Sequence, residues 1–178
     1  MEIMHKIGLF ILFSFACSLS IAVAYSQTTG EPCKSPEALQ FDFWLGSWQL
    51  DWKDPDGTVK SGSNVINKIF GSCVIEENFS SGDNTYFGKS ISMYSPDKKL
   101  WQQTWVDNGG SYLDFTGGMQ DEKMILQRKG KNRNGTEVLQ RMVFYDITKN
   151  EFNWNWEFSN DEGAAWSLVW KIHYTRKL

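Results

Sequence analysis

The chain has 178 residues, a formal net charge of −3 and 15% aromatic residues, with nine tryptophans. A mildly acidic chain of mixed charge lacks the basic patches that neutralise phosphates, so we expect no nucleic-acid partner. The length corresponds to one domain, large enough to close one sizeable core.

The first 24 residues have the features of a secretory signal peptide. Lys6 gives a short positive segment, an apolar run follows over residues 7–24, and Ala22-Val23-Ala24 fits the small-x-small cleavage pattern. The alternative is an uncleaved membrane anchor, because the run is nearly long enough to span a bilayer. The cleavage pattern favours the signal peptide, which predicts a periplasmic or secreted protein without membrane contact after cleavage.

Two cysteines, Cys33 and Cys73, remain after such a cleavage. In an oxidising compartment an even pair of cysteines predicts a disulfide rather than reactive thiols. The bridge would close a loop of about 40 residues and stabilise the fold by roughly 3–4 kcal/mol in the chain-entropy model.

The exported chain divides into a polar, flexible leader over residues 25–35 and a folded domain over residues 36–178. Ser35 and Pro36 fit the N-cap and first position of a helix that is too short to be more than a plug or lid.

From Phe43 onward, short runs rich in β-branched and aromatic residues alternate with turn clusters. This spacing predicts roughly ten strands, and no segment has the helical periodicity that a parallel sheet requires. We therefore predict an all-β fold, a single antiparallel β-barrel of roughly eight to ten strands with a short N-terminal helix. The turn clusters are 54–57, 82–84, 96–98, 108–110, 131–135 and 160–163.

Alternation of residue type is clearest over residues 152–158, where four aromatic residues share one face. In the last strand Trp166, Leu168, Trp170, Ile172 and Tyr174 share a face in the same way. This aromatic content exceeds what a core of this size needs, and it indicates a lined cavity.

Gly46-Ser47-Trp48 resembles the G-x-W that opens the first strand of calycins, the lipocalins and their relatives. In those barrels the tryptophan closes one end beneath a cation from the last strand. Arg176 stands where that cation is expected, so the resemblance implies a calycin-like barrel closed by Trp48 and Arg176.

A wider resemblance covers most of the exported chain. The opening F-D-F-W-L-G-x-W, over residues 41–48, is similar to that of a family of exported bacterial proteins of unknown function. This resemblance implies a bacterial host and a barrel fold, and it implies no activity. Further matches are Gly71-Ser72-Cys73 with Glu77, Trp101 to Asp107, Gly117-Gly118, the S-x-D-x-G-x-x-W segment at 159–166, and Tyr174-Thr175-Arg176.

Period-two spacing places Trp101, Gln103, Trp105 and Asp107 on one face of a strand. Two indoles with an amide and a carboxylate have the composition of a ligand pocket. The alternative is that the opposite face, which begins at Leu100, packs on the core. The opposite face is no more apolar, so we favour the pocket.

Trp154 is a further candidate for the pocket, because large indoles mixed with small inward residues such as Gly88, Ser90 and Ser92 leave ligand-sized gaps. Glu77 and Arg141 either pair inside the barrel or are surface charges.

His173 is the one histidine left after cleavage, and as a late histidine it is a candidate haem ligand. It alternates out of phase with Ile172 and Tyr174, so we expect it to point out of the barrel and expect no haem or other cofactor. One histidine and two bonded cysteines also exclude the common zinc sites and a Ser-His-Asp arrangement.

Three functions remain open. The first is an exported barrel that binds a small apolar or amphipathic molecule. The second is an enzyme that uses Asp107 and Glu77 for acid–base chemistry. The third is a carbohydrate-binding module with exposed tryptophans. We favour the first and assign no catalytic residue.

Overall fold

The computed structural model describes residues 33–132 and 134–177. The predicted signal peptide and residues 25–32 of the predicted leader lie outside the described residues. Two 3₁₀ turns precede ten strands. The elements are η1 (Glu37–Leu39), η2 (Asp42–Trp44), β1 (Gly46–Lys53), β2 (Val59–Ile69), β3 (Val74–Ser81), β4 (Phe87–Ser95), β5 (Leu100–Asp107), β6 (Tyr112–Gln120), β7 (Lys123–Lys131), β8 (Glu137–Tyr145), β9 (Glu151–Ser159) and β10 (Ser167–Arg176).

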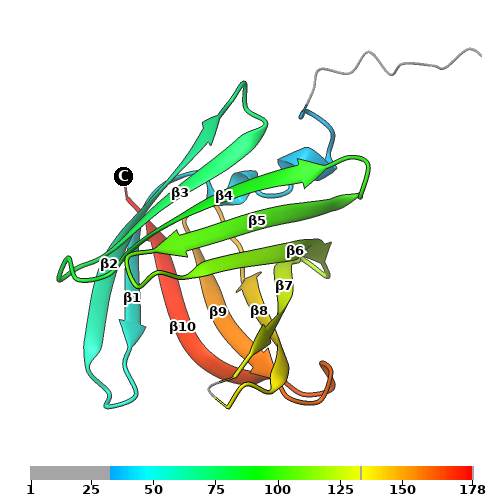
Figure 1. Ribbon diagram of the computed structural model, residues 1–178. Coiled ribbons are helices and arrows are strands. Elements are labelled where there is room, and N and C mark those ends of the chain that lie inside the picture. Colours follow the sequence, from blue (N-terminus) through cyan, green and yellow to red (C-terminus); the bar gives the residue numbers. More distant parts are fainter. Residues whose placement is uncertain (1–32, 133, 178) are drawn as a thin grey trace, which may run out of the picture.

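The ten strands form one closed antiparallel barrel (Figure 1). Each strand pairs with its neighbour in the chain, and β1 closes the barrel by pairing with β10, with Trp48 opposite Arg176. The predicted fold class is therefore confirmed, and the architecture is compatible with a calycin-like barrel. The six predicted turn clusters all lie at connections between consecutive antiparallel strands, as expected of hairpin turns.

Alternating residues of each strand face the interior. In β9 the inward residues Phe152, Trp154 and Trp156 contribute to the core, while Asn155 and Glu157 bond to each other on the outer side. The alternation of aromatic and polar residues seen in the sequence therefore separates the side chains that point into the barrel from those that point outward.

The two ends of the barrel differ. The turns between β1 and β2, β3 and β4, β5 and β6, β7 and β8, and β9 and β10 lie at one end, and η1 and η2 cover the other (Figure 1). At the covered end Phe41 and Trp44 are almost fully buried, and both rings contact Phe144. These turns form the plug expected from the sequence, although they are 3₁₀ turns of three residues rather than an α-helix.

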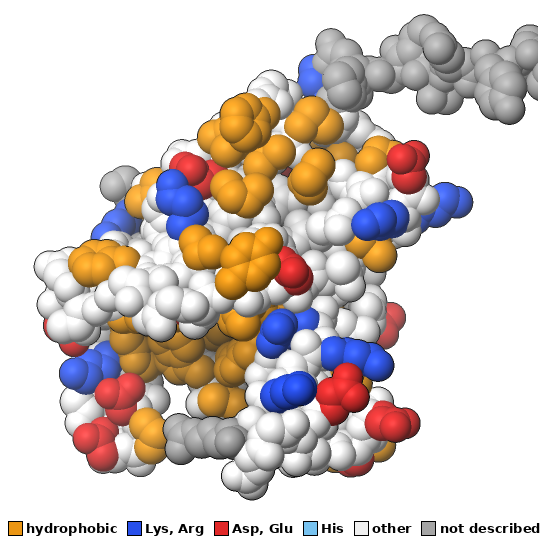
Figure 2. All heavy atoms as spheres, viewed as in Figure 1, with side chains coloured by type: hydrophobic (Ala, Val, Ile, Leu, Met, Phe, Trp, Pro, Cys, Tyr) orange, Lys and Arg blue, Asp and Glu red, His pale blue; other side chains and the backbone are white. Residues whose placement is uncertain are grey.

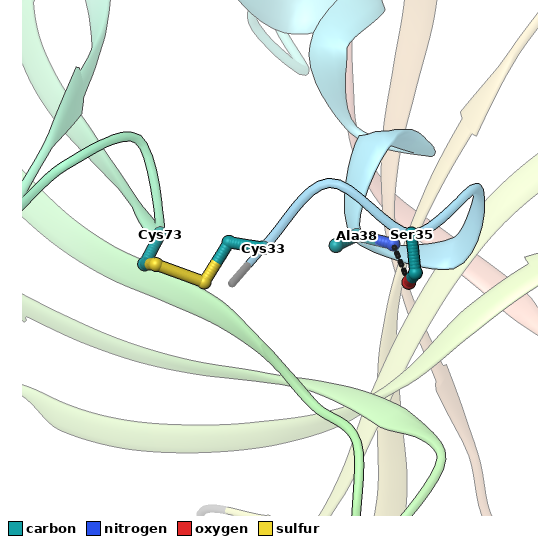
Figure 3. The surroundings of a disulfide bond; sticks show 4 residues. All are labelled: Cys33, Ser35, Ala38 and Cys73. Atoms are coloured by element: carbon teal, nitrogen blue, oxygen red, sulfur yellow. Dashed lines mark hydrogen bonds between the residues drawn. A yellow bond between two sulfur atoms is a disulfide. The ribbon is translucent and has the colours of Figure 1, made fainter. Parts of the chain in front are cut away.

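A disulfide fixes the chain just before the plug (Figure 3). Cys33 bonds to Cys73 in the turn between β2 and β3, which confirms the predicted pairing. The Ser35 hydroxyl accepts a hydrogen bond from the Ala38 amide at 3.3 Å, although the N-cap residue of η1 is Pro36 rather than Ser35. The bridge is consistent with an oxidising extracellular or periplasmic compartment. No helix within the described part of the chain is long and apolar enough to cross a membrane.

Candidate functional site

The barrel contains a cavity of about 210 Å³. Its walls are mainly aromatic and aliphatic, and two carboxylates are also present. Figure 2 shows a hollow with hydrophobic side chains on its walls, between the β1–β2 hairpin and the tips of β7 to β10. The lining residues are Trp44, Glu77, Phe79, Tyr86, Trp105, Asp107, Ser111, Leu113, Phe115, Met142, Phe144, Trp154, Trp156, Trp170, Ile172 and Tyr174.

The aromatic wall is a continuous set of ring contacts. Phe79 lies 5.7 Å from Tyr86, 6.2 Å from Trp105 and 6.1 Å from Trp170 between ring centroids. Trp170 in turn meets Trp154 at 5.7 Å, edge to face. Such edge-to-face contacts hold large rings in fixed orientations, so the rings form a wall of defined shape.

Gly88 on β4 sets the position of Trp105 on β5. A Cβ atom at residue 88 would overlap the six-membered ring of the Trp105 indole, so only glycine allows the ring to lie against the strand. The indole Nε1 then donates to Asp107 at 2.9 Å. The small residue on one strand therefore places the large residue on the next.

Glu77 on β3 is a buried carboxylate in the cavity wall, with 6% of its surface exposed. Its Oε1 accepts a bond from Asn64 Nδ2 and its Oε2 accepts one from the Ser90 hydroxyl, both at 2.6 Å. Burial nevertheless dominates these two bonds and raises the pKa of Glu77 to about 7. Burial and the charge of Glu77 also raise the pKa of Tyr174, which faces it from β10.

Asp107, at the end of β5, is a second carboxylate in the cavity wall, and its pKa is displaced in the opposite direction. Its Oδ2 accepts from the Tyr86 hydroxyl and Trp105 Nε1, and its Oδ1 accepts from the amides of Gly109 and Ser111, all within 3.1 Å. Partial burial opposes ionisation, but the bonds from Trp105 and Ser111 outweigh it and lower the pKa of Asp107 to about 2. The cavity thus holds one carboxylate that titrates near neutrality and one that stays ionised.

Four of the candidate residues from the sequence line the cavity: Glu77, Trp105, Asp107 and Trp154. Trp101 and Gln103 share the inward face of β5 but do not line the cavity. Trp101 lies deeper, where its indole donates to the Glu37 carbonyl of the plug at 3.1 Å. The Gln103 amide is buried and donates to the Ser92 hydroxyl at 2.8 Å.

Arg141 does not line the cavity and does not pair with Glu77. Its Nε bonds to Glu157 at 2.7 Å, and its guanidinium lies 3.9 Å from the centre of the Trp166 ring. Of the two alternatives for Glu77 and Arg141, an interior pair is therefore not found, because residue 141 alternates with the buried Met142 and points out of the barrel.

Sequence reasoning missed several residues of the cavity. Tyr86 and Ser111 belong to turns, where period-two alternation gives no signal. Phe79 could have been found, because it is two residues from Glu77 on the same strand and so shares its face. Asn64 and Ser90 hold the Glu77 carboxylate, and no sequence pattern links the three strands that carry them.

Other expected sites can be placed as well. His173 bonds to Asn153 at 3.2 Å on the side of β10 opposite the buried Ile172 and Tyr174. No group of three or more metal-ligating side chains occurs among residues 33–132 and 134–177. All nine tryptophans lie in these ranges and none is exposed, so the chain has no row of exposed indoles of the kind that stacks on sugars.

The sequence matches none of the known protein-family models, and it matches no curated protein.

Proposed function

We propose that this protein is an exported calycin-like barrel that binds one small apolar or amphipathic molecule in its cavity. The observation that carries the proposal is a cavity of about 210 Å³ with a wall of aromatic rings that contact one another. An apolar cavity of about 150 Å³ is large enough to bind benzene. Filling such a space is favourable because its walls otherwise lack packing partners.

The volume also limits the ligand. Pockets for drug-sized molecules measure roughly 300–1,000 Å³. The cavity is smaller, so a single aromatic ring with a short side chain fits it better than a haem or a long fatty acid. The two carboxylates in the wall, Glu77 and Asp107, support a ligand that carries a polar atom beside its apolar body.

The export part of the proposal is supported by the signal-like N-terminus and by the Cys33–Cys73 bridge. The ring of Trp48 beneath Arg176 supports the calycin-like part. Fractionation of the native host, with the mature N-terminus read by mass spectrometry, tests the export. Recovery of an uncleaved chain in the cytoplasm would contradict it.

Calorimetric titration with 2-phenylethanol, a neutral molecule of the expected size, tests the binding. Leu113 lines the cavity, whereas the adjacent Tyr112 is exposed on the outside. Leu113→Trp should fill the space and abolish saturable binding, whereas Tyr112→Trp should leave it unchanged. If Leu113→Trp binds as the unmodified protein does, the molecule binds elsewhere.

A second candidate is an acid–base enzyme acting in the same cavity. The specific observation is that Glu77 and Asp107 have pKa values displaced in opposite directions, which is the pattern of an acid–base pair. Incubation of the protein with small-molecule extracts of its host, followed by mass spectrometry, tests this candidate. Turnover that disappears in Glu77→Gln, while that variant still binds 2-phenylethanol, would favour the enzyme.

A further inference from the structure

We propose that the cavity selects small organic ammonium ions, with the ammonium group bound to Glu77 and the carbon skeleton packed against the indole rings. This inference rests on the proposed binding function and names its ligand class. It begins from the charges in the wall. Among the described residues that line the cavity, Glu77 and Asp107 are acidic and none is Lys, Arg or His.

The two carboxylates have different roles because their hydrogen-bonding capacities differ. A carboxylate has about four acceptor positions. All four positions of Asp107 are occupied, by donors from Tyr86, Trp105, Gly109 and Ser111. Asp107 therefore contributes negative charge to the cavity but no free acceptor.

Glu77 accepts two hydrogen bonds, from Asn64 and Ser90, so about two of its four acceptor positions remain free. Of the two carboxylates in the wall, Glu77 is thus the one that can accept hydrogen bonds from a ligand. The residues that face it, Asn64 on β2, Ser90 on β4 and Tyr174 on β10, carry no positive charge. A buried carboxylate without a cationic partner is stabilised strongly by a cation that reaches it.

The aromatic wall has the complementary property. Trp105, Trp154 and Trp170 line the same cavity, and the faces of indole rings attract cations. Tyr86 lies near both carboxylates: burial, the hydrogen bond to Asp107 and the charges of Asp107 and Glu77 all raise the pKa of its hydroxyl. The acidic groups and the aromatic rings thus surround one space, which fits a cation with an apolar body.

Arg128 is the cation that could favour the opposite charge. It lies on the inward side of β7, 5.9 Å from the centre of the Phe115 ring, and its Nη1 donates to Gln140 at 2.6 Å. It does not line the cavity, so its effect on a bound molecule is weaker than that of Glu77. The Nε of Arg128 has no hydrogen-bond partner among the described residues, but an anionic ligand in the cavity would also approach the two carboxylates that line it.

The test compares three probes that share one ring and differ in charge: phenethylamine, 2-phenylethanol and phenylacetate. Calorimetry at pH 8 should show the amine binding at least about tenfold more tightly than the alcohol, and phenylacetate most weakly, because a hydrogen bond to a charged group is stronger than one between neutral groups. At pH 5 the ratio between amine and alcohol should fall, because Glu77 is protonated there while Asp107 stays ionised.

Glu77→Gln should reduce the ratio at pH 8 and remove its pH dependence. The matched control is Glu76→Gln, which removes the adjacent carboxylate that pairs with Lys89 outside the barrel. This substitution should change neither the ratio between amine and alcohol at pH 8 nor its pH dependence. Circular dichroism of both variants establishes that they are folded.

The outcomes separate the two proposals. If the alcohol binds as tightly as the amine, or the ratio survives in Glu77→Gln, the ammonium selectivity is wrong and the cavity remains a binding site. A preference for phenylacetate that is lost in Arg128→Met would also overturn the selectivity. If no probe binds saturably, the proposed binding function fails and the selectivity fails with it.

Discussion

The guanidinium of Arg176 lies over the ring of Trp48, with 4.1 Å between Cζ and the ring centroid. Its Nη1 and Nη2 donate to the carbonyls of Leu45 and Phe43, at 2.6 and 3.1 Å. The last strand thereby holds the plug onto the first strand. Gly46 permits this approach, because it has a φ of +114° and a Cβ there would meet Nη1 at 2.6 Å.

We predict that Trp48 and Arg176 are energetically coupled. A double-mutant cycle with Trp48→Phe and Arg176→Ala should give a coupling of at least about 0.5 kcal/mol in the free energy of urea unfolding. Strict additivity of the two substitutions would show that the stacked pair contributes nothing beyond its separate contacts.

The disulfide should account for a substantial part of the stability. Replacing both Cys33 and Cys73 by serine should lower the free energy of unfolding by roughly 3–4 kcal/mol, because the bridge closes a long loop in the unfolded chain. Reduction of the unmodified protein is the control and should give the same loss. A loss below about 1 kcal/mol in both measurements would contradict the chain-entropy argument.

Gly88→Ala should destabilise the barrel by about 1–3 kcal/mol, because the added methyl group overlaps the Trp105 ring and the ring must move. Urea unfolding measures the loss, and the tryptophan emission spectrum reports the displaced indole. Gly118→Ala is the matched control, since a Cβ there meets no atom within 4 Å. Equal effects of the two substitutions would mean that backbone freedom, rather than the Trp105 contact, explains the loss.

Ionisation of the Glu77 carboxyl group should lower the free energy of unfolding as pH rises. Burial raises its pKa from 4.5 to about 7, so between these values the folded state binds a proton that the unfolded state has lost. The contribution is complete below pH 4.5 and is lost as pH rises through 7. The residues facing Glu77 are Asn64, Ser90 and Tyr174, with Tyr86 nearby. None of them carries a positive charge, and Asp107 stays ionised throughout this range.

Relative to Glu77→Gln, the unmodified protein should therefore lose about 2–3 kcal/mol of unfolding free energy between pH 5 and pH 8. Urea unfolding at the two pH values measures this difference. Glu76→Gln should follow the unmodified protein. A difference between the unmodified protein and Glu77→Gln that does not change with pH would show that the Glu77 carboxyl titrates like an exposed one.

The sequence predicted the barrel because its signals were local. Turn clusters such as 108–110 and the alternation over 152–158 depend on neighbouring residues, and both match the structure. The disulfide followed from cysteine parity and a predicted compartment. The pairing of β1 with β10 was inferred through Trp48 and Arg176, which are opposite each other in the register.

The site was harder to predict, because the position of a side chain along the barrel axis and the side to which it points depend on the whole barrel. Trp101 shares a face with Trp105, but the plug covers it, and period two carries no information on position along the barrel axis. Around Arg141 both faces of β8 carry apolar residues, so the sequence did not show which face is inside. The pKa of Glu77 depends on its burial among residues of three other strands, Asn64 on β2, Ser90 on β4 and Tyr174 on β10, which no local pattern encodes.

The most direct test of the central claim is the position of a bound molecule. Intermolecular nuclear Overhauser effects, recorded with saturating 2-phenylethanol, report which side chains touch its ring. Our account predicts contacts to Trp105, Phe115 and Trp154, which line the cavity from three different strands. Contacts confined to the exposed side chains of Ile91, Met93 and Val106 would instead place the molecule on the outer surface and contradict a binding site inside the barrel.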